Sequence, residues 1–347
     1  MIPHSRPWIT DADVDAVVGR LHSGMIAQGA AAARLESMLA ERYGFAAAIA
    51  VGSGCQALLL ALKSSGIGPG AKVGLPTYVC PELLGVVEAI GAEPAIADVD
   101  ESYQLDWQDP ALDDERIKAV VVPSLFGWRA SGPPTGLPGV SIVHDWAQYL
   151  PKGGAFADVE IAILSFGATK ALAAGEGGAV LVRDPELARR VRDFKRITGS
   201  RYGVNLYPFS DLQAALALTQ LGRLDEMIDR RQAVAAQYLR VAAALPAVSA
   251  LQPTPQDVPF RLPMRLVADR APQLTGGVDA LIEAFARHGV AARRPVADLL
   301  HHVRAAGRHF PIAERLYAET FSLPLYPSIA SAEINVVVGA MREVLSV

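Results

Sequence analysis

The chain has 347 residues, of which 51% are apolar and 20% are charged, and its formal net charge is −4. This composition is typical of a globular protein and argues against a disordered or fibrous one. The small net charge gives no broad basic face of the kind that binds nucleic acid.

The amino terminus carries no basic segment followed by an apolar one, which argues against a signal peptide. No apolar run reaches the length that a membrane span requires, so we expect no membrane contact and a cytoplasmic location. The two cysteines, Cys55 and Cys80, fit neither a metal site nor a disulfide framework. We expect both to be small buried residues, and we expect no bound metal.

The first half of the chain alternates helical patterns with short β-rich runs. Helices are predicted at residues 11–21, 31–43, 55–64 and 81–90. Strands are predicted at residues 46–51, 94–97, 119–123, 140–143 and 161–164, and another ends at residue 76. Strands separated by connections of helix length favour a largely parallel sheet that is covered by helices.

The pattern changes after residue 170. A strand at 177–182 is followed by a helix at 185–194, an ordered loop at 199–209, and two helices between 211 and 245, one of them long enough to bridge two domains. A mixed unit follows, with a strand at 260–267, a helix at 278–288, a short strand near residue 291, and helices at 311–319 and 332–345. We therefore predict a large α/β domain over residues 1–240 and a smaller α+β domain over residues 241–347.

Two glycine-rich turns stand beside predicted strands. Residues 52–57, Gly-Ser-Gly-Cys-Gln-Ala, lie between a strand and a helix, where free backbone N–H groups and the helix dipole can bind an anion. Residues 175–178 contain three glycines, which allow tight turning and a close approach of the backbone. Taken alone, each segment would be interpreted as an ordinary turn.

A carboxylate and a lysine follow two other apolar strands. Asp145 comes after the strand at 140–143, at the strand end where ligands bind in open α/β sheets. The alternative is that Asp145 caps the following turn, which is the commoner role of an aspartate at this position. Lys170 follows the strand at 161–164, where partial desolvation would make its amine a better nucleophile toward a carbonyl. An ordinary surface lysine is the alternative.

Together, these features predict a pocket for pyridoxal phosphate. This cofactor needs an amine for its aldehyde, a carboxylate beside its pyridine nitrogen, a cradle for its phosphate, and packing on its ring faces. Lys170, Asp145 and residues 52–57 supply the first three. A protonated pyridine nitrogen makes the ring an electron sink, and Asp145 is the best-placed partner for it.

The chain resembles the DegT/DnrJ/StrS aminotransferases, the sugar aminotransferase group of the fold-type I pyridoxal-phosphate enzymes. Residues 144–148 resemble the family's Glu-Asp-x-Ala-Gln, and residues 165–170 its Ser-Phe-x-x-x-Lys. The other matching segments run almost from end to end: 23–29, 52–58, 76–79, 91–94, 98–100, 125–127, 175–178, 210–215, 223–226, 230–231 and 321–327.

The resemblance implies roles for the residues around the cofactor ring. Lys170 forms the Schiff base, an internal aldimine, and carries the proton between the amino-acid and sugar carbons. Asp145 pairs with the pyridine nitrogen, and Gln148 lies by the 3-oxygen of the ring. Tyr78 stacks on the ring face.

The resemblance also implies a phosphate site and a quaternary structure. Ser165 and the turn at Gly54 and Cys55 hold the phosphate, although the family usually has threonine at the position of Cys55. The family forms homodimers with active sites at the interface, so Asn205 is expected to reach the neighbour's cofactor. Asn205 stands one place away from the family's asparagine, and Gly167 stands where a histidine or aromatic residue is common.

The reaction implied is transfer of an amino group from an amino acid, with glutamate as the expected donor, to a keto-sugar. A nucleotide-linked keto-sugar is the first choice, and a keto-cyclitol is related. A lysine in place of the histidine of the family's dehydratase branch favours amine transfer. A pyridoxal-phosphate-dependent sugar dehydratase or eliminase and a non-catalytic, cofactor-bound regulator are the alternatives. His301 and His302 lie where the family has a substrate-side loop, but two surface histidines fit equally well.

Overall fold

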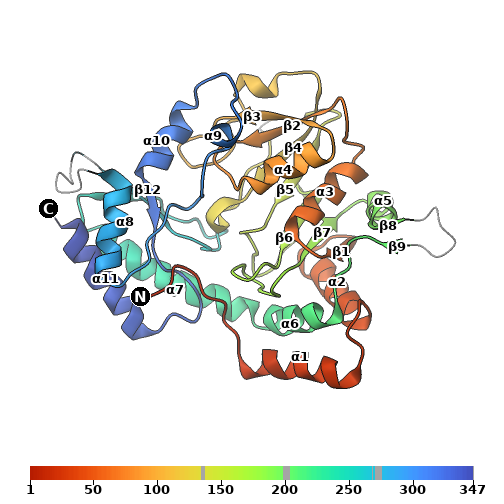
Figure 1. Ribbon diagram of the computed structural model, residues 1–347, viewed down its shortest axis with the longest axis horizontal. Coiled ribbons are helices and arrows are strands. Elements are labelled where there is room, and N and C mark those ends of the chain that lie inside the picture. The colour runs from red at the N-terminus through yellow and green to blue at the C-terminus, as the bar shows by residue number, and fades with distance from the viewer. Residues whose placement is uncertain (134–136, 198–203, 268, 270–275, 347) are drawn as a thin grey trace.

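Figure 1 shows the computed structural model of the chain, which describes residues 1–133, 137–197, 204–267, 269 and 276–346. A seven-stranded sheet forms the centre of the described chain. Its strands are β1 (Ala47–Val51), β2 (Lys72–Pro76), β3 (Glu93–Ala97), β4 (Ile117–Pro123), β5 (Ser141–Asp145), β6 (Ile161–Ser165) and β7 (Gly178–Val182).

The strands lie in the order β1-β7-β6-β5-β4-β2-β3 across the sheet. Every neighbouring pair is parallel except the two that β7 forms with β1 and β6. The largely parallel sheet predicted from the sequence is therefore confirmed. Because β4, β5 and β6 are parallel neighbours, their carboxyl ends meet at one edge, with Asp145 beside Pro123 and Ile163.

Helices cover both faces of the sheet, which is why its strands are apolar on both sides. In β1, Ile49 and Val51 belong to a core with the helices on one face, whereas Ala48 and Ala50 belong to a core with the helices on the other. The first face is covered by α3 (Gly54–Ser64), α4 (Glu82–Ala89) and α5 (Pro185–Lys195). The second face is covered by α2 (Ala30–Tyr43) and α6 (Asp211–Gly222), and α1 (Asp11–Ser23) packs on the outside of α6.

A second core lies toward the carboxyl terminus around a three-stranded antiparallel sheet. Its strands are β10 (Val248–Ala250), β11 (Pro263–Leu266) and β12 (Thr320–Ser322), and the helices of this core are α8 (Gly277–Arg287) and α11 (Ser331–Leu345). The buried side chains of α9 (Leu300–Val303) and α10 (Pro311–Glu319) belong instead to the core on the first face of the large sheet. Helix α7 (Leu224–Ala242) begins in the core of the large sheet and ends in this second core, as expected of a bridging helix. The division between residues 240 and 241 stays a prediction, since α7 contributes to both cores and Ile2 packs on the second one.

Three local expectations need correction, and two short strands were not predicted. Within the predicted loop at 199–209, Val204 and Asn205 form β9, which pairs with β8 (Arg196–Ile197); residues 198–203 lie outside the described residues. Near residue 291, the described backbone forms only isolated bridges, from Val290 to Ile2 and from Arg293 to Ser322. Strand β11 is shorter than predicted. Strands β10 and β12 are three residues long, too short for a period of two to be recognised.

Within the described residues, no helix combines the length and the apolar character needed to span a membrane.

Candidate active site

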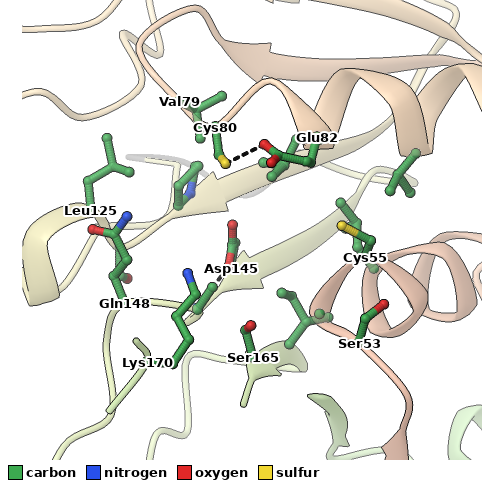
Figure 2. A pocket seen from close by; sticks show the side chains of 18 of the residues that line it. Ser53, Cys55, Val79, Cys80, Glu82, Leu125, Asp145, Gln148, Ser165 and Lys170 are labelled. Atoms are coloured by element: carbon green, nitrogen blue, oxygen red, sulfur yellow. Dashed lines mark hydrogen bonds between the residues drawn. The ribbon is translucent and has the colours of Figure 1, made fainter. Parts of the chain in front are cut away.

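A cavity of about 200 Å³ opens where β4, β5 and β6 end (Figure 2). It brings together most of the predicted site residues, namely Gly54, Cys55, Asp145, Gln148, Ser165 and Lys170. Tyr78 and Asn205 are not among the residues that line it. Ser53 and Glu176, from the two glycine-rich turns, also line it. Val79, Cys80 and Glu82 line it too, and the sequence did not identify them as site residues.

Asp145 is the last residue of β5 and is buried. One carboxylate oxygen accepts a hydrogen bond from the N–H of Ala147 at 2.8 Å, and the other has no hydrogen-bond partner among the described residues. Burial raises the pKa of this carboxyl, and the Ala147 N–H and the charge of Lys170 oppose the rise only in part. A cationic group beside the free oxygen would reverse this effect, so the site fits a protonated ring nitrogen.

Gln148 has an amide orientation fixed by its surroundings. Its side-chain oxygen accepts a hydrogen bond from the backbone N–H of Phe126 at 2.8 Å. A backbone N–H can only donate, so the amide oxygen must face Phe126 and the NH₂ group is left for the cavity. The site therefore offers a donor on the side where the ring 3-oxygen is expected.

The turn at residues 125–127, which binds the side chain of Gln148, is hydrogen-bonded to the segment before β11. Phe126 adopts a left-handed conformation with φ of 62°, and its carbonyl accepts a hydrogen bond from the N–H of Phe260 at 2.8 Å. Gly127 is required next to it, because a Cβ there would stand 1.7 Å from the carbonyl oxygen of Val258. This side of the cavity is thereby fixed to the carboxy-terminal part of the chain.

The amino end of α3 has the geometry expected of an anion cradle. The Ser53 hydroxyl caps the helix by accepting the N–H of Gln56, which leaves the N–H groups of Gly54 and Cys55 without partners in the described structure. Ser165, at the end of β6, packs so closely that a Cβ on Gly54 would lie 2.9 Å from the Ser165 Cβ. Two free N–H groups, a hydroxyl and a helix dipole suit a phosphate.

Lys170 lies in the connection between β6 and β7, in a turn closed by its N–H to the carbonyl of Gly167 at 2.9 Å. Its side chain is half-buried, and its ammonium stands 5.8 Å from the ring centre of Phe260. In Figure 2 it extends into the cavity toward Asp145. The amine is therefore available to a carbonyl group bound between the cradle and Asp145.

The wall across from Lys170 consists of the segment after β2, with Val79, Cys80 and Glu82 (Figure 2). The expectation that both cysteines are buried is wrong: Cys55 and Cys80 are exposed, and both line the cavity. The Cys80 thiol donates a hydrogen bond to Glu82 at 2.5 Å. Partial desolvation of the thiol at the cavity wall and the bond to Glu82 raise the pKa of Cys80 to about 12.

Tyr78 points away from this cavity. Its ring is fully buried and packs edge-on against Tyr103, with ring centres 5.2 Å apart, and against Phe126. The structure thus contradicts the expected position of Tyr78 on a ring bound in the cavity. The neighbouring Val79 and Cys80 line the cavity instead.

Asn205 lies outside the cavity of its own chain. Its side-chain NH₂ donates to the Gln28 side-chain oxygen at 2.7 Å, and its side-chain oxygen accepts from the N–H of Tyr207. A contact between Asn205 and the cofactor of a neighbouring chain stays a prediction.

The charged groups that line the cavity are Lys170, Asp145, Glu82 and Glu176. The cavity therefore combines one amine, one buried carboxylate, a neutral anion cradle and an amide donor. This donor set fits pyridoxal phosphate, which needs each of these contacts.

The fold is that of the fold-type I pyridoxal-phosphate-dependent aminotransferases. The chain belongs to the DegT/DnrJ/EryC1/StrS aminotransferase family, whose sequence profile matches residues 7–131 and 138–342. The chain is an aminotransferase of this sugar aminotransferase family, and its cofactor is pyridoxal 5'-phosphate.

Three relatives illustrate the similarity. The spore coat polysaccharide biosynthesis protein SpsC of Bacillus subtilis is 29% identical over 386 residues, covering 99% of this chain and 97% of SpsC. The aminotransferase TlmJ of Streptoalloteichus hindustanus is 27% identical, with a TM-score of 0.86 and 99% of each chain covered. DesV of S. venezuelae, whose structure contains a ketimine intermediate, is 26% identical, with a TM-score of 0.82 and 98% of each chain covered.

Proposed function

We propose that this aminotransferase moves the amino group of an amino acid, with glutamate as the donor, to a nucleotide-linked keto-sugar. The observation that carries the proposal is the convergence of Lys170, Asp145 and the amino end of α3 on one cavity. SpsC is named for polysaccharide biosynthesis, and polysaccharides are built from nucleotide-activated sugars, which favours such an acceptor.

Each residue of the cavity has a defined task in this proposal. Bound pyridoxal phosphate supplies an electron sink that stabilises negative charge on the carbon losing a proton. Asp145 keeps the proton on the ring nitrogen. Gln148 donates a hydrogen bond to the 3-oxygen, and Ser165 with the N–H groups of Gly54 and Cys55 binds the phosphate. The Lys170 amine holds the cofactor and then moves the proton at the substrate carbon.

A half-reaction tests the proposal. The purified holoprotein is mixed with glutamate alone, and 2-oxoglutarate and the amine form of the cofactor are measured. We expect one equivalent of each per active site. A nucleotide-linked keto-sugar should then return the cofactor to its aldehyde form while the 2-oxoglutarate remains, with the amino-sugar detected by mass spectrometry. Lys170→Ala, with Lys118→Ala on the surface as the matched control, should abolish both steps.

Other outcomes would point to the alternatives. Loss of a sugar hydroxyl without a half-reaction by any amino acid would favour a dehydratase or eliminase. Tight cofactor binding without either reaction would favour a regulator. Amination of a keto-cyclitol, but of no nucleotide-linked sugar, would change only the acceptor.

We also propose a cytoplasmic homodimer with active sites at its interface. Support for the dimer comes from α1, where Val14, Val18 and Leu21 are exposed at helical spacing on one face. Exposed Met25 and Ile26 follow them in the chain. Contiguous exposed apolar side chains of this kind are typical of a protein interface.

A further inference from the structure

The segment that forms the cavity wall begins at Thr77, directly after β2. Thr77 is fully buried, and its N–H donates to the carbonyl of Ala97 at the end of β3. Val79 and Cys80, which line the cavity, are two and three residues further on. The position of Thr77 therefore sets where this wall begins.

Helix α9 binds Thr77 through three contacts. The N–H of Leu300 donates to the Thr77 carbonyl at 2.9 Å, and the N–H of His301 donates to the Thr77 hydroxyl at 3.3 Å. The hydroxyl also lies 2.7 Å from Nδ1 of His301. The side chain of His301 thus completes a clasp between α9 and the end of β2.

The imidazole of His301 is itself held on its other sides. It stacks on Phe310, with ring centres 4.3 Å apart and planes 14° from parallel, and its Nε2 lies 3.4 Å from a carboxylate oxygen of Glu314. The start of α10 is fixed in turn, because Asp98 accepts the N–H groups of Ile312 and Ala313. The ring therefore has one orientation, toward Thr77.

His302 differs from its neighbour. Its side chain is 42% exposed, whereas that of His301 is 9% exposed, and its Nδ1 pairs with Asp298 of the same segment at 2.6 Å. It makes no hydrogen bond to Thr77 in the described structure. The two histidines left equivalent by the sequence are therefore distinguished by their contacts.

We propose that His301 is a positioning residue that acts through Thr77 to hold Val79 and Cys80 against the cofactor ring. This inference rests on the proposed cofactor site, but it concerns the shape of the wall and not the identity of the substrates. His302 has no such role, which makes it a matched control.

The reactivity of the Cys80 thiol reports whether the cavity wall keeps its conformation. In a Cys55→Ser background, Cys80 is the only thiol of the chain, and its rate of reaction with a disulfide reagent reports how it is held. We expect His301→Ala to raise this rate in the cofactor-free protein, and His302→Ala to leave it unchanged. His301→Asn, which keeps a polar atom at the position of Nδ1, should restore most of the protection.

Cofactor affinity gives the second readout. Titration of the cofactor-free protein with pyridoxal phosphate should show weaker binding in His301→Ala by roughly two- to tenfold, the effect of losing one hydrogen bond. The visible circular dichroism of the bound cofactor should fall as well. Thr77→Val should have a similar effect, and the double variant should lose little more than either single one.

The proposal is overturned if His301→Ala matches His302→Ala in both readouts, or if the effects of His301→Ala and Thr77→Val add fully. Should His301→Ala fail to fold, His301→Phe, which keeps a ring to stack on Phe310 but removes Nδ1, takes its place in the same measurements. Neither readout depends on amine transfer. Failure of the proposed reaction with protection of Cys80 intact would therefore refute the function and leave the positioning role standing.

Discussion

The carboxyl of Asp145 is buried, and burial raises its pKa despite the N–H of Ala147 and the nearby charge of Lys170. A protonated ring nitrogen beside it would compensate the desolvated charge, whereas a neutral amide at this position could not. We expect Asp145→Asn to bind pyridoxal phosphate but to slow the glutamate half-reaction by roughly 100-fold or more, as when one preorganised electrostatic partner is removed. Stopped-flow absorbance measures this rate, and an unchanged rate would exclude the assigned role.

A negatively charged side chain lines the same cavity as the expected phosphate site. The Glu82 carboxylate lines the same cavity as Gly54 and Cys55, in the turn expected to bind a phosphate. Partial desolvation raises the pKa of the Cys55 thiol, and the charge of Glu82 adds to the rise. Repulsion between two anions weakens binding. Glu82→Gln and Cys55→Thr should each tighten pyridoxal phosphate binding, by roughly two- to tenfold if one hydrogen bond or its equivalent is gained.

Equilibrium titration of the cofactor-free protein measures this change. Glu283→Gln, an exposed substitution on α8 that removes the same charge, is the control and should leave the affinity as it was. Weaker binding in Glu82→Gln would mean that the carboxylate helps to hold the cofactor.

Among the elements, α2 depends on a carboxylate from another helix. Asp211, the first residue of α6, accepts the N–H groups of Gly29, Ala31 and Ala32 at the start of α2. Burial alone would raise the pKa of Asp211, but these N–H groups and Arg20 outweigh it, and the pKa lies below its ordinary value. The resulting stability is present above the ordinary pKa and is lost as the pH falls through the lowered one.

We therefore expect Asp211→Asn to reduce the free energy of unfolding at neutral pH by about 1–3 kcal/mol, the scale for hydrogen bonds to a charged group. The difference from the wild type should shrink as the carboxyl becomes protonated in acid. Urea unfolding at several pH values measures both, with Asp15→Asn on the exposed side of α1 as the control. A difference independent of pH would contradict the electrostatic explanation.

The order of strands explains which residues of the site could be predicted from the sequence. Asp145 and Lys170 follow apolar strands, and the rule that ligands bind at the carboxyl ends of parallel strands located both. The same rule could have identified Cys80 and Glu82, because both closely follow the parallel strand β2. Tyr78 was misplaced because the family pattern specifies a residue type, whereas the direction of its ring depends on packing against Tyr103, more than twenty residues away.

The features that could not be predicted depend on contacts between residues far apart in the sequence. The clasp between Thr77 and His301 joins residues 224 positions apart, and no local pattern encodes it. Strands β10 and β12 exist because β11 lies between them, so their pairing and not their composition defines them. Helix α10, by contrast, has the bounds predicted from the sequence, and the other helices with predicted bounds agree within two residues.

At the scale of the whole molecule, the exposed apolar face of α1 is the structural basis for the proposed homodimer. Leu21→Asp would place a charge in that interface and should shift the protein from dimer to monomer in size-exclusion chromatography with light scattering. Val336→Asp, at a comparably exposed apolar site on α11, should remain dimeric. Equal molecular masses for Leu21→Asp and the wild type would show that α1 is not part of the dimer interface.

The central claim is that the cofactor is held by Lys170 in the cavity at the ends of β4, β5 and β6. Borohydride reduction of the holoprotein, followed by digestion and mass spectrometry, tests it most directly. We expect the reduced cofactor on the peptide containing Lys170, and we expect Lys170→Ala to retain no covalent label and to form no 2-oxoglutarate from glutamate. A label on another lysine, or amine transfer by Lys170→Ala, would contradict it.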